Sequence, residues 1–332
     1  MPSSSAAAPG PGGALVVEVR PRSPYRLSTQ RWPDGVARTR DSVYERFLHI
    51  AGSPVLIRAW QNPGGVVSIA AMPAPPAWLQ TRRLAGAGAG REELERALDC
   101  GRRALGVDDD LSEFHARFRR DPLLGPLIRR MPWLRPRRAA QLWEALAWAI
   151  TEQLIESTRA AQIQRRIVRR WGSALQIPGA RAPLRDVPCA STVAGLAPAE
   201  LAALDLAPKR ALAMIAVARE IASGRCDLAR GEDDPRLERI SEIGPWTMQC
   251  LGLNGRGELD SLPAGDLAYL KLVGRLAGLG RRATIVEVEE FYAPYEPYRG
   301  ITGLLTLAGH GRSVAAGPPL RYHPPAPELH AA

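Results

Sequence analysis

The sequence is poor in cysteine and has no long hydrophobic run. Its 332 residues include four cysteines, which lie far apart and form no Cys-x-x-Cys pair, so the spacing typical of zinc sites and of small disulfide frameworks is missing. No apolar run reaches the roughly 18 residues that predict a transmembrane helix. Residues 1–13 lack the basic and then apolar pattern of a signal peptide. We therefore expect a protein of the reducing cytosol that does not bind a membrane.

The sequence also lacks an internal repeat and a nucleotide-binding glycine motif. The glycine-rich run at residues 86–90 does not follow a strand, so it is typical of a loop. What the chain does have is positive charge, with a formal net charge of +10 and a pI of about 10.1. A basic surface favours nucleic acid or an anionic membrane as partner. The arginine-rich composition of a GC-biased genome would give the same charge.

The first part of the chain predicts a small α/β domain at residues 14–107, after a disordered segment at 1–13 that is rich in proline and glycine. Apolar runs rich in valine and isoleucine predict strands at residues 15–19, 55–60 and 66–70. Residues 42–50 fit either a strand or a short helix. The spacing of leucine and alanine predicts a helix at residues 91–105.

The rest of the chain predicts a helical domain at residues 108–309, followed by a loose, proline-rich tail at 310–332. Helical spacing of apolar residues predicts helices at 139–153, 157–171, 196–206, 209–223 and 284–292. On one of these helices, the arginines at positions 159, 166 and 170 lie opposite an apolar stripe. Such a face either meets solvent or contacts an anionic partner.

Two helical segments around a tight turn, at about residues 235–253, organise this domain. The first helix breaks at Ile243-Gly244-Pro245 and a second begins at Trp246. The first turn of the second helix has free backbone N–H groups, which suit a phosphate. Beyond it, Asp266 opens another apolar helix. Taken alone, an aspartate at that position is an ordinary helix cap.

Together these motifs resemble the helix-hairpin-helix DNA glycosylases, and most of all their alkylation-repair branch, DNA-3-methyladenine glycosylase II. The motifs that carry the resemblance are residues 243–247 (IGPWT), 262–266 (LPAGD), and the DPLL and PWLRP segments that begin at Asp121 and Pro132. The resemblance implies a mainly α protein with an N-terminal α+β unit. It also implies a monofunctional enzyme that hydrolyses the N-glycosidic bond of alkylated bases, because the members with lyase activity carry a lysine where Trp246 stands.

The resemblance also assigns roles to individual residues. It makes Asp266 the catalytic carboxylate. It implies that Gln153 and Leu154 lie against the DNA, with Leu154 filling the gap left by the extruded base. It assigns further residues to the base pocket (Trp246, Cys250, Leu307) and to the DNA backbone (Ile243, Gly244, Trp246, Arg159, Arg166, Arg170).

The resemblance implies that the protein is a monomer and that its partner is double-stranded DNA containing damaged bases. It also implies a location in the cytoplasm, at the nucleoid. We expect no iron–sulfur cluster, because no cysteine follows Cys250, and a monovalent cation is expected at the hairpin. Three departures from the family pattern, at Glu242, Cys250 and Leu307, keep two alternatives open. One is a glycosylase for an oxidised or deaminated base. The other is a DNA-binding helix-hairpin-helix protein without catalysis.

Overall fold

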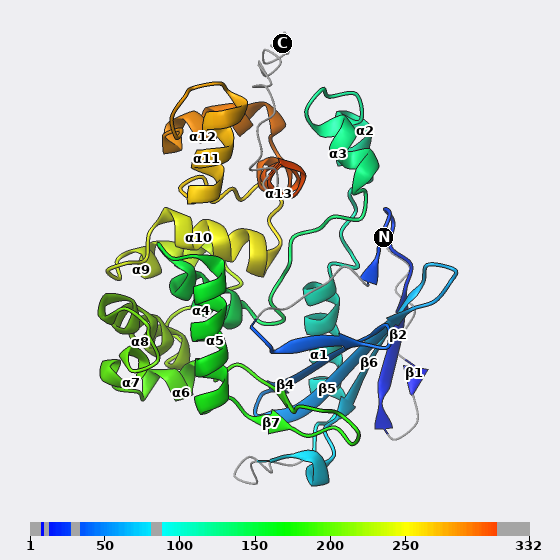
Figure 1. Ribbon diagram of the computed structural model, residues 1–332. Helices are drawn as coiled ribbons and strands as arrows, with labels where there is room; N and C mark the ends of the chain where they lie inside the picture. The colour runs from blue at the N-terminus through cyan, green and yellow to red at the C-terminus, as the bar shows by residue number, and fades with distance from the viewer. Residues whose placement is uncertain (1–7, 10–12, 28–33, 81–87, 311–332) are drawn as a thin grey trace.

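The computed structural model of the chain describes residues 8–9, 13–27, 34–80 and 88–310 (Figure 1). Of the segment predicted to be disordered, residues 1–7 and 10–12 lie outside the described part, as do residues 311–332 of the predicted tail. Ala8–Pro9 forms the short strand β1, which pairs with β2, so the prediction was wrong for these two residues. His310 is not part of a tail either, because it ends the last helix.

The N-terminal unit is an antiparallel sheet in the order β1-β2-β6-β5-β4-β3. The three predicted strands are confirmed as β2 (Leu15–Val19), β5 (Ser53–Gln61) and β6 (Val67–Pro73). The ambiguous segment is strand β4 (Val43–Ile50), and its outer neighbour β3 (Ala37–Arg40) was not predicted.

The β4–β5 connection is a two-residue turn. Ala51 and Gly52 have φ angles of 49° and 85°, and positive φ at both positions matches the twist of a tight hairpin. Side chains alternate along each strand, so the two faces of the sheet belong to different cores. Ile57 packs in one core with α1 (Arg91–Leu105), whereas Leu56 packs in another with the hairpin of β7 (Ala174–Leu175) and β8 (Leu184–Arg185).

The first helical core contains the predicted hairpin, and we call it the hairpin lobe. It forms because the apolar stripes of its helices face one another. In α5, for example, Ile163 and Ile167 are each 1% exposed. Its main helices are α4 (Leu142–Glu152), α5 (Ser157–Trp171), α6 (Ala190–Ala194), α7 (Pro198–Ala202), α8 (Pro208–Ala222), α9 (Asp234–Glu238) and α10 (Pro245–Leu251).

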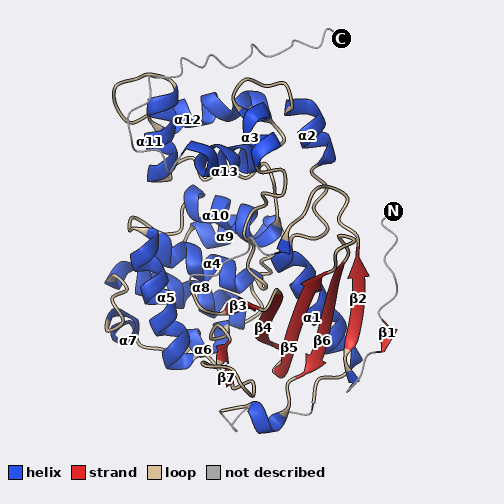
Figure 2. Ribbon diagram, turned by 45° about the vertical axis from the view of Figure 1, so that its right-hand side comes forward, coloured by secondary structure: helices blue, strands red, loops and turns tan. Residues whose placement is uncertain are grey.

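The second helical core joins segments that are far apart in sequence, and we call it the C-terminal lobe. It packs α2 (Ser112–Phe118) and α3 (Leu124–Arg130) with α11 (Leu267–Leu276), α12 (Ile285–Tyr292) and α13 (Arg299–His310). Figure 2 shows this lobe stacked above the hairpin lobe, with the sheet to one side. The predicted helical domain therefore contains two cores, one on each side of the hairpin helix α10.

Some predicted helix boundaries were wrong. The helix expected at 196–206 is the shorter α7, which begins at Pro198, and α6 precedes the predicted range and ends before Gly195. The helix expected from residue 139 begins at Leu142, and α10 continues beyond Leu251 as a π-helical turn, Gly252–Arg256. None of the helices in the described segments is long and apolar enough to cross a membrane.

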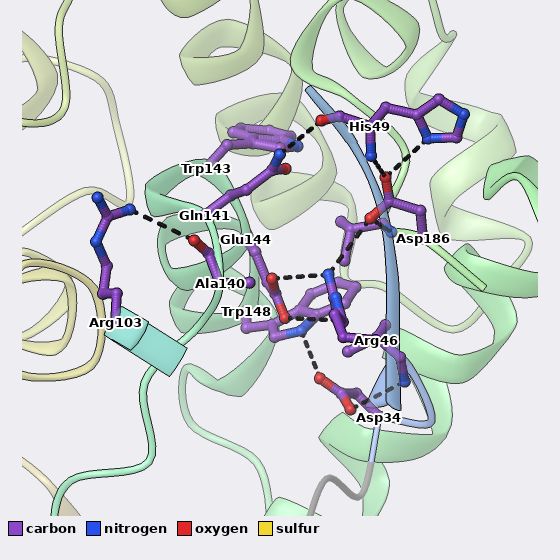
Figure 3. A network of polar contacts seen from close by, with 12 residues as sticks. Asp34, Arg46, His49, Arg103, Ala140, Gln141, Trp143, Glu144, Trp148 and Asp186 are labelled. Carbon is purple, nitrogen blue, oxygen red and sulfur yellow. Dashed lines mark hydrogen bonds and ion pairs between the residues drawn. The ribbon is translucent and has the colours of Figure 1, made fainter. Parts of the chain in front are cut away.

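A buried network of charged groups fastens α4 to the sheet (Figure 3). Arg46 of β4 is 1% exposed and donates to both carboxylate oxygens of Glu144 at 3.3 and 3.0 Å, and to Asp186 at 3.3 Å. The indole N–H of Trp148 donates to Asp34 at 2.9 Å. Burial raises the pKa of Glu144 to about 7, although the positive charge of Arg46 opposes the rise. Because α4 ends at Glu152, this network fixes the position of the residues that follow it.

Candidate active site

The hairpin turn is formed as the sequence motif predicts, but its first helix is shorter. Helix α9 ends at Glu238, and two turn-type bonds follow it, from Ile240 N–H to Leu237 and from Ile243 N–H to Ile240. Gly244 has an extended backbone and precedes α10. Among the hydrogen bonds of the described residues, none uses the N–H of Gly244 or Trp246 as donor. Both amides are therefore available to an acceptor from outside the chain.

Glu242 stands in the turn with a φ of 71°, a region that favours glycine. The backbone is therefore strained at this non-glycine residue. Its carbonyl accepts from the Gln153 amide at 2.6 Å, and its carboxylate lies within electrostatic range of Arg210 on α8. Arg210 was not singled out from the sequence. Its positive charge offsets the acidic residue that the turn would otherwise present to a phosphate.

Gln153 does not have the position that the resemblance implied. Its side chain is buried (9% exposed), and its amide also donates to Thr247 Oγ1 at 2.9 Å. A side chain held in this way cannot also extend into DNA, so the geometry does not support intercalation by Gln153. Instead it ties the end of α4 to the start of α10.

Leu154, unlike the buried Gln153, is exposed to solvent. It is 95% exposed and has a φ of 53°, an unfavourable backbone conformation for a residue with a branched side chain. It lies outside α4, which ends at Glu152, so it does not continue that helix's apolar face. An apolar side chain held out in solvent on strained backbone indicates a functional position.

Asp266 caps the next helix, as the sequence predicts. Its Oδ1 accepts from the N–H of Ala268 at 2.7 Å at the start of α11. The preceding Gly265 brings Trp246 close, because a Cβ placed on this glycine would lie 3.7 Å from Trp246 Cδ1 and 3.6 Å from Ile285 Cδ1. The structure thus brings together the half-buried Trp246 of the hairpin lobe and Asp266 of the C-terminal lobe. Ile285, which is 51% exposed here, was not found from the sequence.

The two remaining pocket predictions differ in their surroundings. Cys250 is buried on α10, one turn beyond Trp246, and burial raises its thiol pKa, with the negative charges of Glu152 and Asp266 adding to the rise. Leu307 is half-buried on α13 and packs against the core of the C-terminal lobe. Cys250 therefore lies within electrostatic range of Asp266, while Leu307 has a packing role that accounts for its position.

The predicted arginine face lies along α5 and is partly neutralised. Asp205 is 2.9 Å from Arg166 and 3.8 Å from Arg159. Arg170 is exposed on the last turn of the helix. Because surface ion pairs contribute little, both paired guanidinium groups can exchange this carboxylate for a phosphate. Arg159 lies on the first turn of α5, five residues after Leu154.

The structure adds a carboxylate that sequence reasoning missed. Glu152, the last residue of α4, is half-buried and accepts from the side-chain amide of Gln164 at 3.1 Å. Burial raises the pKa of Glu152 and the charge of Asp266 adds to the rise, while the charge of Glu152 adds to the raised pKa of Cys250. In the sequence Glu152 looked like one more polar residue at a helix end. Among the described residues, no group of three His, Cys, Asp or Glu side chains is arranged to hold a metal ion.

No protein-family model matches the chain, but individual proteins do. It is 26% identical over 204 residues to the DNA-3-methyladenine glycosylase of Bacillus subtilis (strain 168), covering 58% of this chain and 65% of that protein. It is 25% identical over 268 residues to the probable bifunctional transcriptional activator/DNA repair enzyme AlkA of Mycobacterium tuberculosis, covering 80% of this chain and 50% of that protein. The chain thus spans 50–65% of the length of these curated relatives.

Solved structures share the fold across both helical lobes and the sheet. The 3-methyladenine DNA-glycosylase from Archaeoglobus fulgidus matches with a TM-score of 0.73 and 18% identity over 90% of this chain and 99% of that chain. The Clostridium acetobutylicum 8-oxoguanine glycosylase/lyase in complex with double-stranded DNA matches with a TM-score of 0.65 and 14% identity over 94% of this chain and 98% of that chain. At these identities the likeness concerns the fold.

The fold is that of the helix-hairpin-helix DNA glycosylases, as the sequence motifs predict. The sequence relatives carry the names DNA-3-methyladenine glycosylase and DNA repair enzyme AlkA, which agree with the alkylation-repair branch that the motifs resemble.

Proposed function

We propose that the protein is a monofunctional DNA glycosylase that extrudes alkylated bases of the 3-methyladenine type from double-stranded DNA and hydrolyses their N-glycosidic bond. The observation that carries this proposal is the approach of Trp246 to the backbone just before Asp266. An aromatic face and a carboxylate therefore lie together at the meeting of the two helical lobes. Sequence relatives with glycosylase names support the same reaction.

Asp266 supplies the charge that this reaction needs. Cleavage of the C1′–N bond develops positive charge on the sugar, and an ionised carboxylate beside it stabilises that charge and orients the attacking water. The N-terminus of α11 places its positive dipole end and the N–H of Ala268 at this carboxylate. An alkylated purine is already cationic, so its departure needs little protonation.

Recognition of the base follows from the residues around this carboxylate. A cationic base stacked on the Trp246 indole gains about 0.5–2 kcal/mol from a cation–π contact. Extruding the base costs a few kcal/mol, and Leu154, at 95% exposure, offsets part of that cost by filling the vacated space. The free amides of Gly244 and Trp246, with the Ile243 turn behind them, would bind the phosphate backbone.

We further propose that the reaction leaves an intact abasic site. A lyase needs an amine that attacks the anomeric carbon, and the hairpin position that would supply one holds Trp246. The whole chain has two lysines, Lys209 and Lys271. Lys271 is exposed on α11, about one and a half turns beyond Asp266. This rotation points the lysine away from the side of the helix that carries Asp266.

We propose that the protein acts as a monomer without a cofactor. The four separated cysteines support the absence of an iron–sulfur cluster. A monovalent cation at the hairpin stays a prediction. The turn offers backbone carbonyls for it, and those of Ile240, Glu242 and Gly244 already accept hydrogen bonds within the chain.

The proposal is tested by replacing Asp266 with Asn and measuring base release from a duplex that carries a single 7-methylguanine. We expect release to fall by at least about 10³-fold, as when a group that stabilises transition-state charge is removed. Binding to a duplex with an abasic-site analogue should stay within about threefold of the wild type, because such a ligand needs no charge stabilisation at the sugar. Asp99→Asn, at an exposed aspartate of α1, is the matched control. Unchanged turnover in Asp266→Asn would refute the assignment.

The rivals predict different substrates for the unmodified protein. A glycosylase for an oxidised base would release 8-oxoguanine in preference to 7-methylguanine, and a non-catalytic protein would release neither. The proposed function predicts release of 7-methylguanine and 3-methyladenine, with no release of 8-oxoguanine under the same conditions.

A further inference from the structure

Gln153 connects the parts of the protein that the proposed reaction places on DNA. Its side-chain amide donates to the carbonyl oxygen of Glu242 in the hairpin turn at 2.6 Å and to Thr247 Oγ1 on the first turn of α10 at 2.9 Å. Thr247 directly follows Trp246, and Leu154 directly follows Gln153. One buried side chain therefore joins the exposed leucine to the hairpin turn and to the helix that carries the indole.

The amide of Gln153 is held at one end only. Its Nε2 makes both bonds, whereas its Oε1 is buried and has no partner among the described residues. The carbonyl of Glu242 accepts and cannot donate, so the NH₂ end has to face the hairpin. A buried acceptor without a partner costs free energy. The side chain thus keeps its contact with the hairpin although its other end is left unsatisfied.

Backbone strain lies on both sides of this contact. Leu154, one residue after Gln153, has a φ of 53°, and Glu242, whose carbonyl accepts the amide, has a φ of 71°. Residues with a Cβ keep such angles only where the surrounding structure holds them, and strain of this kind gathers at functional positions. The bond from Gln153 to Glu242 therefore links the two strained positions and holds the turn and the exposed leucine in one arrangement.

Resting on the proposed glycosylase function, we propose that Gln153 is a positioning residue that couples the hairpin's hold on a phosphate to the insertion of Leu154 into the base stack. The hairpin amides fix the DNA backbone, and the leucine fills the space that the extruded base leaves. Both contacts form together only when the leucine lies at the right distance from the bound phosphate. Groups held in the productive arrangement in advance lose less entropy when they act together. Gln153 therefore acts on extrusion of the base and leaves bond cleavage to Asp266.

Single-turnover release of 7-methylguanine from two duplexes tests this inference. In one duplex the lesion is paired with cytosine, and in the other it lies in a single-nucleotide bulge with no base opposite. Extrusion costs less for a base that is already unpaired. Gln153→Met keeps the size of the side chain and removes the donor. It should lower release from the paired duplex by about tenfold or more, while release from the bulge stays within about threefold of the wild type.

A double variant shows whether Gln153 acts through Leu154. Leu154→Gly removes the side chain that Gln153 positions, so the addition of Gln153→Met should lower release from the paired duplex by no more than about a further twofold. Binding of an undamaged duplex to Gln153→Met should stay within about threefold of the wild type, because the phosphate contacts remain.

Thr247 gives a second way to break the same contact. Thr247→Val keeps the shape of the side chain and removes the hydroxyl that accepts from Gln153. It should reproduce part of the loss on the paired duplex without a loss on the bulge. Thr247→Ser keeps the hydroxyl and should release the base from both duplexes as the wild type does.

Gln164 offers the matched control. It is another buried amide (2% exposed) at the end of α4, where it donates to Thr151 Oγ1 at 2.9 Å and to Glu152 Oε1 at 3.1 Å. Both acceptors belong to α4 itself and not to the hairpin. Gln164→Met should therefore lower the melting temperature without changing the ratio of the two release rates.

Equal fractional losses on the two duplexes in Gln153→Met would overturn the inference and show a structural role. Wild-type release from the paired duplex in that variant, or independent losses in the double variant, would overturn it too. Each of these results includes release of 7-methylguanine by the wild type, so the proposed function would stand. No release from either duplex by the wild type would refute the proposed function itself.

Discussion

Helix α4 carries two glutamates that are partly or fully buried in opposite settings. Glu144, on its first turn, is 3% exposed and receives two hydrogen bonds from Arg46, so its charge is matched inside the protein (Figure 3). Glu152, at the last turn, receives its hydrogen bond from the neutral amide of Gln164 and lies within electrostatic range of Asp266. The same residue type on one helix thus pairs with a buried cation at one end and with a neutral amide at the other.

The two ends of α4 therefore have different roles in the fold. The start of α4 is fixed to the sheet by compensated charge. Its end carries strained backbone, with Leu154 at a φ of 53° and fully exposed to solvent. Features that would be unfavourable in a core are gathered at the end that faces the other lobe, and the network at the start holds them in place.

The largest effect on stability is expected at the anchored end. Arg46→Met leaves Glu144 and Asp186 buried without their cation, which should lower the free energy of unfolding by about 3–5 kcal/mol. Urea denaturation would measure this loss. Arg91→Met is the matched control. Arg91 pairs with Glu95 at 2.7 Å on the surface, and its loss should cost no more than about 1 kcal/mol. Equal stability of the two variants would contradict the anchoring role.

A substitution at Leu154, just after the end of α4, should raise the stability of the protein and lower its rate of base release. Leu154→Gly relieves the positive φ and should raise the free energy of unfolding by about 1 kcal/mol. It should also lower single-turnover base release by about tenfold or more, because extrusion costs a few kcal/mol that the leucine partly offsets. Leu212→Gly, at a 56% exposed leucine within α8, should instead lose about 1 kcal/mol of stability without a change in base release. A Leu154→Gly variant with unchanged release would show that this side chain does not enter DNA.

The arginine face of α5 should give the smallest effect at any one salt concentration. Each phosphate contact contributes a slope of about −0.9 in log K against log salt, so Arg159, Arg166 and Arg170 together account for at most about three such contacts. Replacing all three with Ala should flatten the slope of DNA binding. Asp205→Asn should strengthen binding slightly, because it frees two of them. The same replacements at three arginines of α1 (Arg91, Arg96 and Arg102) should leave the slope unchanged.

Much of this fold could be predicted from periodicity and turn residues. Helices α1 and α5 match their predicted ranges, and the cap at Asp266 forms as expected. The failures have physical reasons. Strand β3 is short and two of its four residues are arginines, so it gives no apolar signal. The packing of α2 and α3 with α11–α13 depends on contacts between distant segments, which local patterns do not record.

The site was predictable in part for the same reasons. Asp266 and Trp246 belong to a local motif, and the structure brings them together. The bonds of Gln153 and the electrostatic setting of Glu152 depend on where α10, α5 and α11 lie relative to α4. Neither could be read from residues 151–155, in which both residues look like polar positions at a helix end.

The most direct test of the account is the product formed when the wild-type protein acts on a duplex with one 7-methylguanine in the presence of borohydride. The account predicts free 7-methylguanine and an intact abasic site that breaks only on later treatment with alkali. It predicts no trapped protein–DNA adduct, because Trp246 stands where an amine would form a Schiff base. A borohydride-trapped adduct, or strand cleavage without alkali, would contradict the monofunctional mechanism.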